Sequence, residues 1–161
     1  MTQQPSHLDD SGKLRMVNVA RKRPTRRQAQ ASCVVRTEAD FTTLGSSVEG
    51  IEALHGARLA GIQGAKQTSN LIPLCHPLSL NEVRVELRPG PGVVEVSASV
   101  DATERTGVEM EALTACAVAA LTILNALLEV DPFAQIDDLG LDRKTGGKSG
   151  DWGRFVGTPG R

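Results

Sequence analysis

Two lysines flank a pair of glycines near the C-terminal end of the chain, in the stretch Lys144-Thr-Gly-Gly-Lys148-Ser-Gly-Asp. Glycine lets the backbone approach a ligand closely and lysine neutralises phosphate, so this composition indicates a phosphate-binding loop. The spacing is not that of the common nucleotide loop G-x-x-x-x-G-K-[ST], because Asp142 stands where its first glycine should be. On this stretch alone, a flexible basic tail explains the same residues slightly better.

A histidine between two prolines is the second candidate for chemistry. His76 directly precedes Pro77, and the residue before a proline is restricted to extended geometry. A fixed imidazole can act as an acid, a base or a hydrogen-bond donor to phosphate. Cys75 beside it points to the opposite side of an extended chain, so the two do not form a dyad. A small buried side chain is the favoured explanation of Cys75, and a structural loop histidine explains His76 as well as function does.

Two acids lie close to the start of a long predicted helix, where acidic residues are common for structural reasons. They are Glu109 and Glu111, and Glu111 lies on one helical stripe with Asn125. Fourteen residues of helix separate them, roughly 21 Å at about 1.5 Å per residue, so one small ligand could hardly touch both in one chain. If both ends matter, the site is shared between subunits or there are two sites.

A run of basic residues near the N-terminus, Arg21 to Arg27, could bind phosphate, although such a run is more often a solvated loop. The net charge of −1 and the pI of about 6.3 argue against a protein held to nucleic acid by its overall charge. Only one tryptophan, three phenylalanines and no tyrosine are available for base stacking. We therefore expect no nucleic-acid partner.

The cysteines and the apolar segments indicate a cytoplasmic protein. The three cysteines form no C-x-x-C pair and are typical of reduced thiols. With His7 and His55 as the only other histidines, the sequence predicts no metal site. The N-terminus has no signal peptide, and the longest uncharged run, from Ala112 to Leu128, is shorter than the ~20 residues of a membrane span. We expect no contact with a membrane.

The order of the predicted elements indicates an α+β fold. A chain of 161 residues is long enough for one domain with a real core. Alternating apolar residues predict strands, helical spacing predicts helices, and Thr106-Gly-Val-Glu109 has the form of a capping box. The strands are expected at residues 16–19, 31–37, 80–87, 94–100 and 136–141, and the helices at 48–66 and from about 109 to 130. This is the β-α-β-β-α-β order of a ferredoxin-like sandwich with an extra N-terminal strand.

The predicted domain organisation is simple. Residues 1–14 are expected to be a disordered tail, residues 15–155 a single domain, and residues 156–161 a C-terminal tail. The long helix is apolar nearly all round, which is typical of a helix covered on more than one side. One sheet covers one side, and a second subunit could cover another.

Five segments in order carry a family resemblance over about residues 15 to 155. They are Met16-Val-Asn-Val, Ala60-Gly-Ile-Gln-Gly-Ala-Lys66, Leu71-Ile-Pro-Leu-Cys-His-Pro-Leu78, Thr106-Gly-Val-Glu-Met-Glu-Ala-Leu-Thr-Ala115 and Lys144-Thr-Gly-Gly-Lys-Ser-Gly-Asp151. Together they resemble the cyclic pyranopterin monophosphate synthase family, the molybdenum-cofactor biosynthesis protein C family. The resemblance implies a ferredoxin-like fold and a hexamer built as a trimer of dimers, with active sites between subunits.

The resemblance also implies a reaction and the residues that serve it. The family converts 3′,8-cyclo-7,8-dihydro-GTP to cyclic pyranopterin monophosphate and releases pyrophosphate. The matching substrate-binding positions are Leu74, Cys75, His76, Met110 and Glu111, and the matching cations are Arg27, Lys66, Lys144 and Lys148. Catalytic roles fall on His76, Lys66 and the position of Asn125. No cofactor is certain, although Mg²⁺ can accompany the triphosphate.

Three positions depart from the family pattern. Asn125 and Leu128 stand where the family has Asp and Lys, and Gly50 stands at a catalytic Lys. None of these side chains can titrate, and general acid–base groups are worth roughly 10²–10⁴-fold each. Two functions therefore remain: a lyase of molybdopterin synthesis, which we place first, and a catalytically impaired member that binds a nucleotide or a partner subunit without turnover. Nucleic-acid binding through the basic loop comes last.

Overall fold

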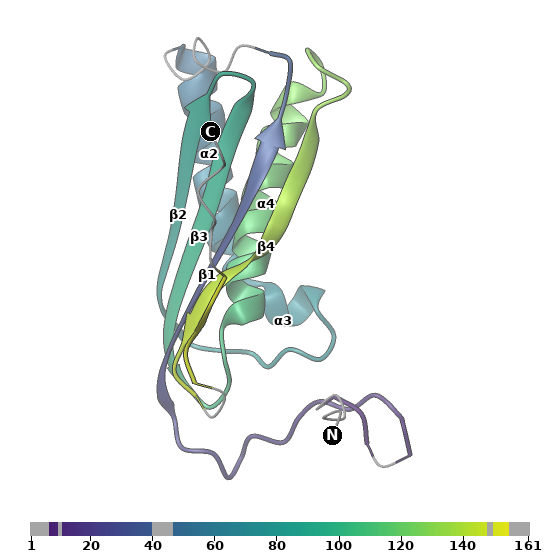
Figure 1. Ribbon diagram of the computed structural model, residues 1–161, viewed down its shortest axis with the longest axis vertical. Helices are drawn as coiled ribbons and strands as arrows, with labels where there is room; N and C mark the ends of the chain where they lie inside the picture. The colour runs from purple at the N-terminus through teal and green to yellow at the C-terminus, as the bar shows by residue number, and fades with distance from the viewer. Residues whose placement is uncertain (1–6, 10, 40–46, 148–149, 155–161) are drawn as a thin grey trace.

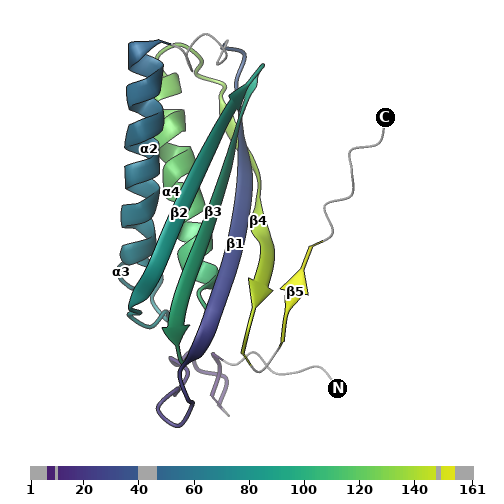
Figure 2. The same cartoon turned by 90° about the vertical axis from the view of Figure 1, so that its left-hand side faces the viewer.

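An antiparallel sheet forms one layer of the fold and the helices form the other, as Figure 2 shows in side view. The computed structural model describes residues 7–9, 11–39, 47–147 and 150–154. Their elements are β1 (Thr25–Arg36), α2 (Val48–Lys66), α3 (Thr68–Leu71), β2 (Leu80–Gly90), β3 (Val93–Glu104), α4 (Glu109–Leu127), β4 (Gln135–Thr145) and β5 (Trp152–Gly153) (Figure 1).

The strand order β2-β3-β1-β4-β5 confirms the ferredoxin-like prediction. The first four strands and the two long helices follow the order β-α-β-β-α-β, and both helices cover the same face of the sheet (Figure 2). Among the described residues, no helix covers the other face (Figure 2). The two long helices run antiparallel, so the start of α2 and the end of α4 lie at the same end of the molecule (Figure 1).

Small apolar side chains build the core between the two layers. Alternate residues of the strands point inward, as a period of two requires. The inward residues include Ala29, Ala31, Cys33 and Val35 on β1, Val94, Val96, Ala98, Val100 and Ala102 on β3, and Ala112, Ala115, Cys116, Ala119, Ala120, Ile123 and Leu127 on α4. Within this core the sulfur atoms of Cys33 and Cys116 lie 3.3 Å apart as free thiols.

Two glycines let α2 approach α4 closely. A Cβ atom added at Gly61 would lie 2.8 Å from the carbonyl oxygen of Ala115, and one at Gly64 would lie 2.9 Å from the Val118 side chain. Such distances are shorter than real Cβ contacts, so any other residue would push the helices apart. The predicted helix at residues 48–66 is confirmed, and Ser47 caps it by accepting a hydrogen bond from the Gly50 N–H.

Two local predictions were wrong. Residues 16–19 form no strand, and Met16 is exposed without a neighbouring strand to pair with. The additional strand of the described sheet is instead β5, which pairs with β4 through Arg143 and Lys144. Thr106 does not cap α4 either: Val108 occupies the N-cap position and no side chain caps that end.

The helix α4 is long and apolar enough to cross a membrane on length and composition alone, with a mean hydropathy of 1.7. Half of this apolar stretch is buried inside the protein, against the sheet and α2. It therefore packs as the central helix of the sandwich.

Candidate active site

The loop before β2 and the first turn of α4 line one pocket of about 370 Å³. The loop contributes Leu74, Cys75 and His76, which are all half-buried, and α4 contributes Met110 and Glu111. These residues come from the two segments that the resemblance assigns to substrate binding. The fold thus brings the two segments together in what we call the recognition pocket.

A second, strongly basic cavity of about 830 Å³ adjoins the recognition pocket. The two share Thr106 and Gly107 of the connection between β3 and α4, Glu109 of α4, and Lys22 from the N-terminal basic run. Among the described residues, six cationic side chains and one carboxylate line this basic cavity. The cations are Lys22, Arg23, Arg26, Arg27, Arg105 and Lys144, and the carboxylate is Glu109. An excess of cations of this size suits a polyanion such as a triphosphate.

The glycine pair between the two lysines serves close packing against an arginine. Gly146 and Gly147 have φ angles of +83° and +85°, which favour glycine. A Cβ atom at Gly147 would overlap the Arg27 guanidinium, and one at Gly146 would overlap the carbonyl of Arg26. The loop therefore holds Arg27 of the same chain against the basic cavity. The Nε atom of Arg27 is buried and has no hydrogen-bond partner within the described residues.

Lys144 joins the sheet to the start of α4. Its Nζ atom donates to Glu109 Oε1 at 3.0 Å, and both side chains are largely buried. In the β1–β4 register Lys144 lies opposite Ala29, whose side chain is buried under the helices, so Lys144 points toward the helix layer. Glu109 is thus an ion-pair partner at the mouth of the basic cavity rather than part of a capping box.

Glu111 is the buried acid of the recognition pocket, with only 4% of its surface exposed. Burial raises the pKa of Glu111 to about 7, and the nearby Glu109 carboxylate adds to the effect. Burial also raises the pKa of the Cys75 thiol, with the charge of Glu111 as a second cause. A carboxyl group that titrates near neutral pH can take up or release a proton during a reaction.

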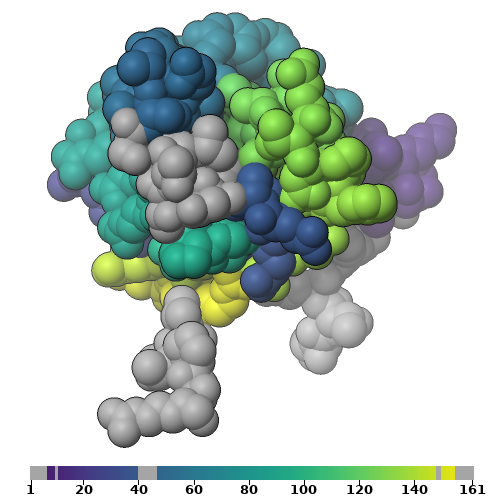
Figure 3. All heavy atoms as spheres, turned by 90° about the horizontal axis from the view of Figure 1, so that it is seen from above, coloured from purple at the N-terminus to yellow at the C-terminus, as the bar shows by residue number. Residues whose placement is uncertain are grey.

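The remaining predicted residues lie elsewhere. Lys66 is exposed at the end of α2 and lines neither cavity, and Lys148 lies outside the described residues. Asn125 and Leu128 are exposed near the end of α4, far from the recognition pocket. Gly50 lies in the first turn of α2, which Figure 3 shows beside the end of α4. The three positions that depart from the family pattern therefore cluster at the end of the helix layer opposite the two cavities (Figure 1).

Four of the cations were not predicted individually. Lys22, Arg23 and Arg26 belong to the basic run that we interpreted first as a solvated loop, and the density of charge in that run was the available signal. Arg105 comes from the β3–α4 connection, and only its position directly before Thr106-Gly-Val-Glu109 could have pointed to it. No cluster of three or more His, Cys, Asp or Glu side chains suited to a metal ion occurs among the described residues.

Comparisons with known proteins agree with this geometry. The family model described as "MoaC family" matches residues 16–147. A cyclic pyranopterin monophosphate synthase of Streptomyces avermitilis is 50% identical over 151 residues, which cover 92% of this chain and 89% of the relative. The cyclic pyranopterin monophosphate synthase 2 of Mycobacterium tuberculosis strain H37Rv is 47% identical over 152 residues, or 92% and 90% of the two chains. A relative of the same name from Desulforapulum autotrophicum is 48% identical over 149 residues, or 90% and 91%.

Proposed function

The chain belongs to the MoaC family, and we propose that it is a lyase of molybdenum cofactor biosynthesis. It converts 3′,8-cyclo-7,8-dihydro-GTP to cyclic pyranopterin monophosphate and releases pyrophosphate. The observation that carries this proposal is the 47–50% identity to enzymes of that name over at least nine-tenths of the chain. The joined recognition pocket and basic cavity support it, because a nucleotide needs one place for its ring system and another for its phosphates.

The two cavities divide the binding of the substrate. In this proposal the triphosphate lies in the basic cavity, where Lys144 and Arg27 neutralise it and the unsatisfied Nε–H of Arg27 gains an acceptor. Mg²⁺ carried with the triphosphate would share this neutralisation. The ring system lies in the recognition pocket, between the loop of Leu74 to His76 and the first turn of α4. Glu111 and His76 are then the titratable groups nearest the bonds that rearrange.

A second subunit completes the site in this proposal. Glu111 and Asn125 are separated by fourteen residues of continuous helix, about 21 Å, so Asn125 cannot reach the recognition pocket of its own chain. An antiparallel arrangement of two chains would bring the far end of one α4 to the cavities of the other. We therefore expect dimers assembled into a cytoplasmic hexamer, with Lys66 and Asn125 contributing only in the assembly.

The test is a turnover assay with the cyclised GTP substrate on the unmodified protein and two variants. Lys144→Gln removes one charge from the basic cavity and should weaken substrate affinity about tenfold or more, with a smaller loss at high salt. Arg36→Gln removes the same charge where Arg36 pairs with Asp137, outside both cavities, and should leave affinity unchanged. Equal losses in both variants would contradict the assignment of the basic cavity.

The same assay decides whether turnover is impaired. Binding without product formation would establish the alternative of a binding protein. In that case the joint variant Gly50→Lys, Asn125→Asp and Leu128→Lys should raise kcat more than affinity, because proton carriers act in the transition state. The three are tested together, since groups that act as a unit do not add. A rate in the ordinary range of enzymes, roughly 1–10³ s⁻¹, in the unmodified protein would reject the impaired alternative.

A further inference from the structure

The sheet face that carries no helix is polar, and its side chains are arranged in rows across the strands. We call it the outer sheet face. The cross-strand register places Arg84 of β2 opposite Ser99 of β3, Ser99 opposite Gln30 of β1, and Gln30 opposite Arg143 of β4. Arg84, Ser99, Gln30 and Arg143 therefore form one row with an arginine at each end and two short polar side chains between them.

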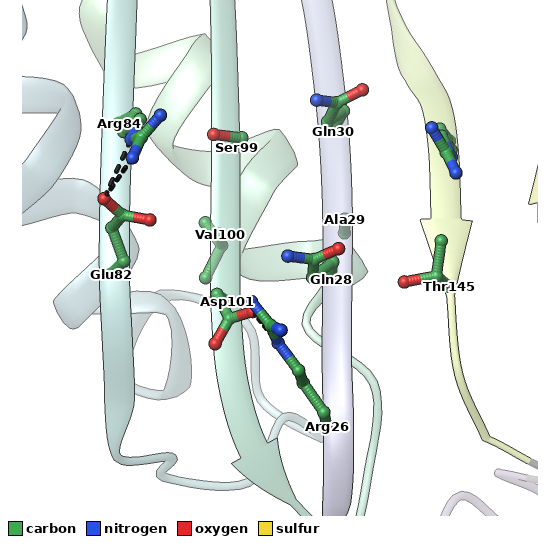
Figure 4. Close-up of a pocket in the computed structure, with 11 residues that line it drawn as sticks. Arg26, Gln28, Ala29, Gln30, Glu82, Arg84, Ser99, Val100, Asp101 and Thr145 are labelled. Carbon is green, nitrogen blue, oxygen red and sulfur yellow. Dashed lines mark hydrogen bonds and ion pairs between the residues drawn. The ribbon is translucent and has the colours of Figure 1, made fainter.

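A cavity of about 300 Å³ lies over this row. Serine and glutamine in the middle of the row do not fill the space between the two arginines, and Figure 4 shows Arg84, Ser99 and Gln30 along one line across the strands. Adjacent strands are about 4.8 Å apart, so the backbones of Arg84 and Arg143 are separated by about 14 Å. Arginine side chains are long enough to approach a common ligand across that distance.

The charges around the cavity leave an arginine in excess. Three arginines and two carboxylates of the described part of the chain line it. Arg84 pairs with Glu82 at 2.8 Å and Arg26 pairs with Asp101 at 2.8 Å. Arg143 makes no ion pair or side-chain hydrogen bond with any described residue, and its side chain is exposed. The row thus combines a free guanidinium with further N–H donors on Arg84, a hydroxyl on Ser99 and an amide on Gln30.

This cavity is separate from the basic cavity of the active site. A β-bulge between Gln30 and Ala31 interrupts the β1–β4 pairing, and the two residues that follow it on β4 face opposite ways. Lys144 points to the helix layer and pairs with Glu109, whereas Arg143 lies opposite Gln30 on the outer sheet face. Of the residues that the structure describes, only Arg26 lines both cavities.

We propose that the outer sheet face binds a small tetrahedral oxyanion, a phosphate group, between Arg84 and Arg143 over Ser99 and Gln30. Two guanidinium groups offer planar sets of N–H donors that match the oxygens of phosphate, and the hydroxyl and the amide provide further donors from below. The site is independent of the proposed enzymatic function. The phosphate group comes either as the free ion or on a nucleotide, and the cavity volume admits both.

The location of the anion is tested by soaking crystals of the full-length protein with tungstate, a tetrahedral oxyanion with a strong anomalous signal. We expect an anomalous peak over Ser99 and Gln30, in addition to any peak beside Lys144. A peak at Lys144 without one over Ser99 would overturn the proposal. So would a crystal in which a second copy of the chain covers the row.

The affinity is tested by calorimetric titration with inorganic phosphate. Arg143→Gln should weaken phosphate binding at the outer sheet face about tenfold or more and leave binding in the basic cavity unchanged. Lys144→Gln should weaken binding in the basic cavity and leave binding at the outer sheet face unchanged. Arg36→Gln serves as the matched control, because it removes the same charge from a residue of β1 outside the cavity. If Arg36→Gln weakens phosphate binding as much as Arg143→Gln does, general electrostatics explains the binding and the proposal fails.

A second titration, with adenosine monophosphate, distinguishes the two sources of the phosphate group. Tighter binding than inorganic phosphate that still depends on Arg143 identifies a nucleotide, and equal or weaker binding identifies the free ion. Thermal unfolding of each variant shows that the fold is retained. Arg143→Lys keeps the charge but loses the planar set of donors, so it should bind with intermediate affinity.

Discussion

At the scale of single residues, the site depends on a few charged groups whose surroundings determine their chemistry. Lys144 and Glu109 neutralise each other at the entrance of the basic cavity. Glu111, two residues further along α4, has no ion-pair partner among the described residues and is buried, so its proton is held until about neutral pH. The burial of Glu111 therefore determines the pH at which this carboxyl group ionises.

Replacing Glu111 tests the effect of its burial on the pH dependence of protein stability. Burial disfavours its ionised form, so the folded protein holds the proton up to a pKa of about 7, against 4.5 for an ordinary glutamate. The associated stability is fully present below about pH 4.5 and is lost as the pH rises through 7. At about 1.4 kcal/mol per pKa unit, the free energy of unfolding should fall by roughly 2.5 kcal/mol more between pH 5 and pH 8 in the unmodified protein than in Glu111→Gln.

The measurement is urea unfolding at pH 5 and pH 8, at one protein concentration and without substrate. The exposed Glu52 on α2 provides the control, since Glu52→Gln should keep the pH dependence of the unmodified protein. The same pH dependence in Glu111→Gln and Glu52→Gln would contradict the assignment of this titration to Glu111.

At the scale of elements, close packing of α2 on α4 determines the distance between the two long helices. The small residues of this interface allow it: Gly61 lies against the backbone of α4 at Ala115 and also against Val85 of β2. Helices that pack at this distance tolerate little added volume.

Gly61→Ala should therefore destabilise the fold by about 1–3 kcal/mol, although alanine favours helices more than glycine does. Gly56→Ala on the same helix is the matched control. A Cβ atom at Gly56 meets nothing within 4 Å, so the substitution should stabilise the protein by about 0.5–1 kcal/mol. Thermal unfolding of the two variants measures both effects. A stabilised Gly61→Ala protein would show that the helices can separate without cost.

The sequence alone predicted most of these elements, and the errors have physical reasons. The bounds of α2 are those predicted, because the spacing of its apolar residues is a local signal. In β1 the strand begins at Thr25 and includes Arg26 and Arg27, which the prediction left in a basic loop. Charged residues are compatible with a strand when one face of the sheet is open to solvent. In residues 16–19 apolar and polar side chains alternate as in a strand, but no other strand lies beside them. The alternation alone does not show whether a partner strand is present.

The candidate site was predictable in part. The segments around His76 and Glu111 could be found because each is a continuous motif, and the structure places them in one pocket. Arg105 could not be found in this way, since it joins the basic cavity only when the β3–α4 connection folds beside the N-terminal basic run. The Glu109–Lys144 ion pair likewise links residues that are 35 apart in the sequence. The local pattern around Glu109 instead indicated a capping box, so the ion pair was not predicted.

At the scale of the whole molecule, the two outer surfaces differ in character. The outer sheet face is polar and carries alternating charges, whereas the helix layer exposes large apolar side chains such as Leu59, Leu121 and Leu128. Leu121, Asn125 and Leu128 recur at helical spacing on the side of α4 that faces away from the sheet. Exposed apolar side chains grouped on one face are typical of protein interfaces, which supports assembly through the helix layer.

Leu121→Asp should therefore dissociate the assembly, because a charge would be buried without a partner at the interface. Light scattering coupled to size-exclusion chromatography at micromolar concentration measures this, and the unmodified protein should behave as a hexamer. Leu139→Asp, at a leucine of β4 with a similar exposed fraction of 46%, should remain assembled. A stable monomer of the unmodified protein would exclude the proposed assembly and the shared site.

The pairing of β5 with β4 also gives the protein an internal optical probe. Trp152 is the only tryptophan of the chain, no tyrosine is present, and its backbone pairs with that of Lys144. The Gly146 N–H donates a hydrogen bond to Asp151, and Trp152 is 46% exposed. The tryptophan fluorescence of the protein therefore comes from Trp152 alone, next to the lysine that faces the basic cavity. Rapid-mixing fluorescence can therefore time the arrival of a phosphate-bearing ligand in the unlabelled protein, without assigning signals among several fluorophores.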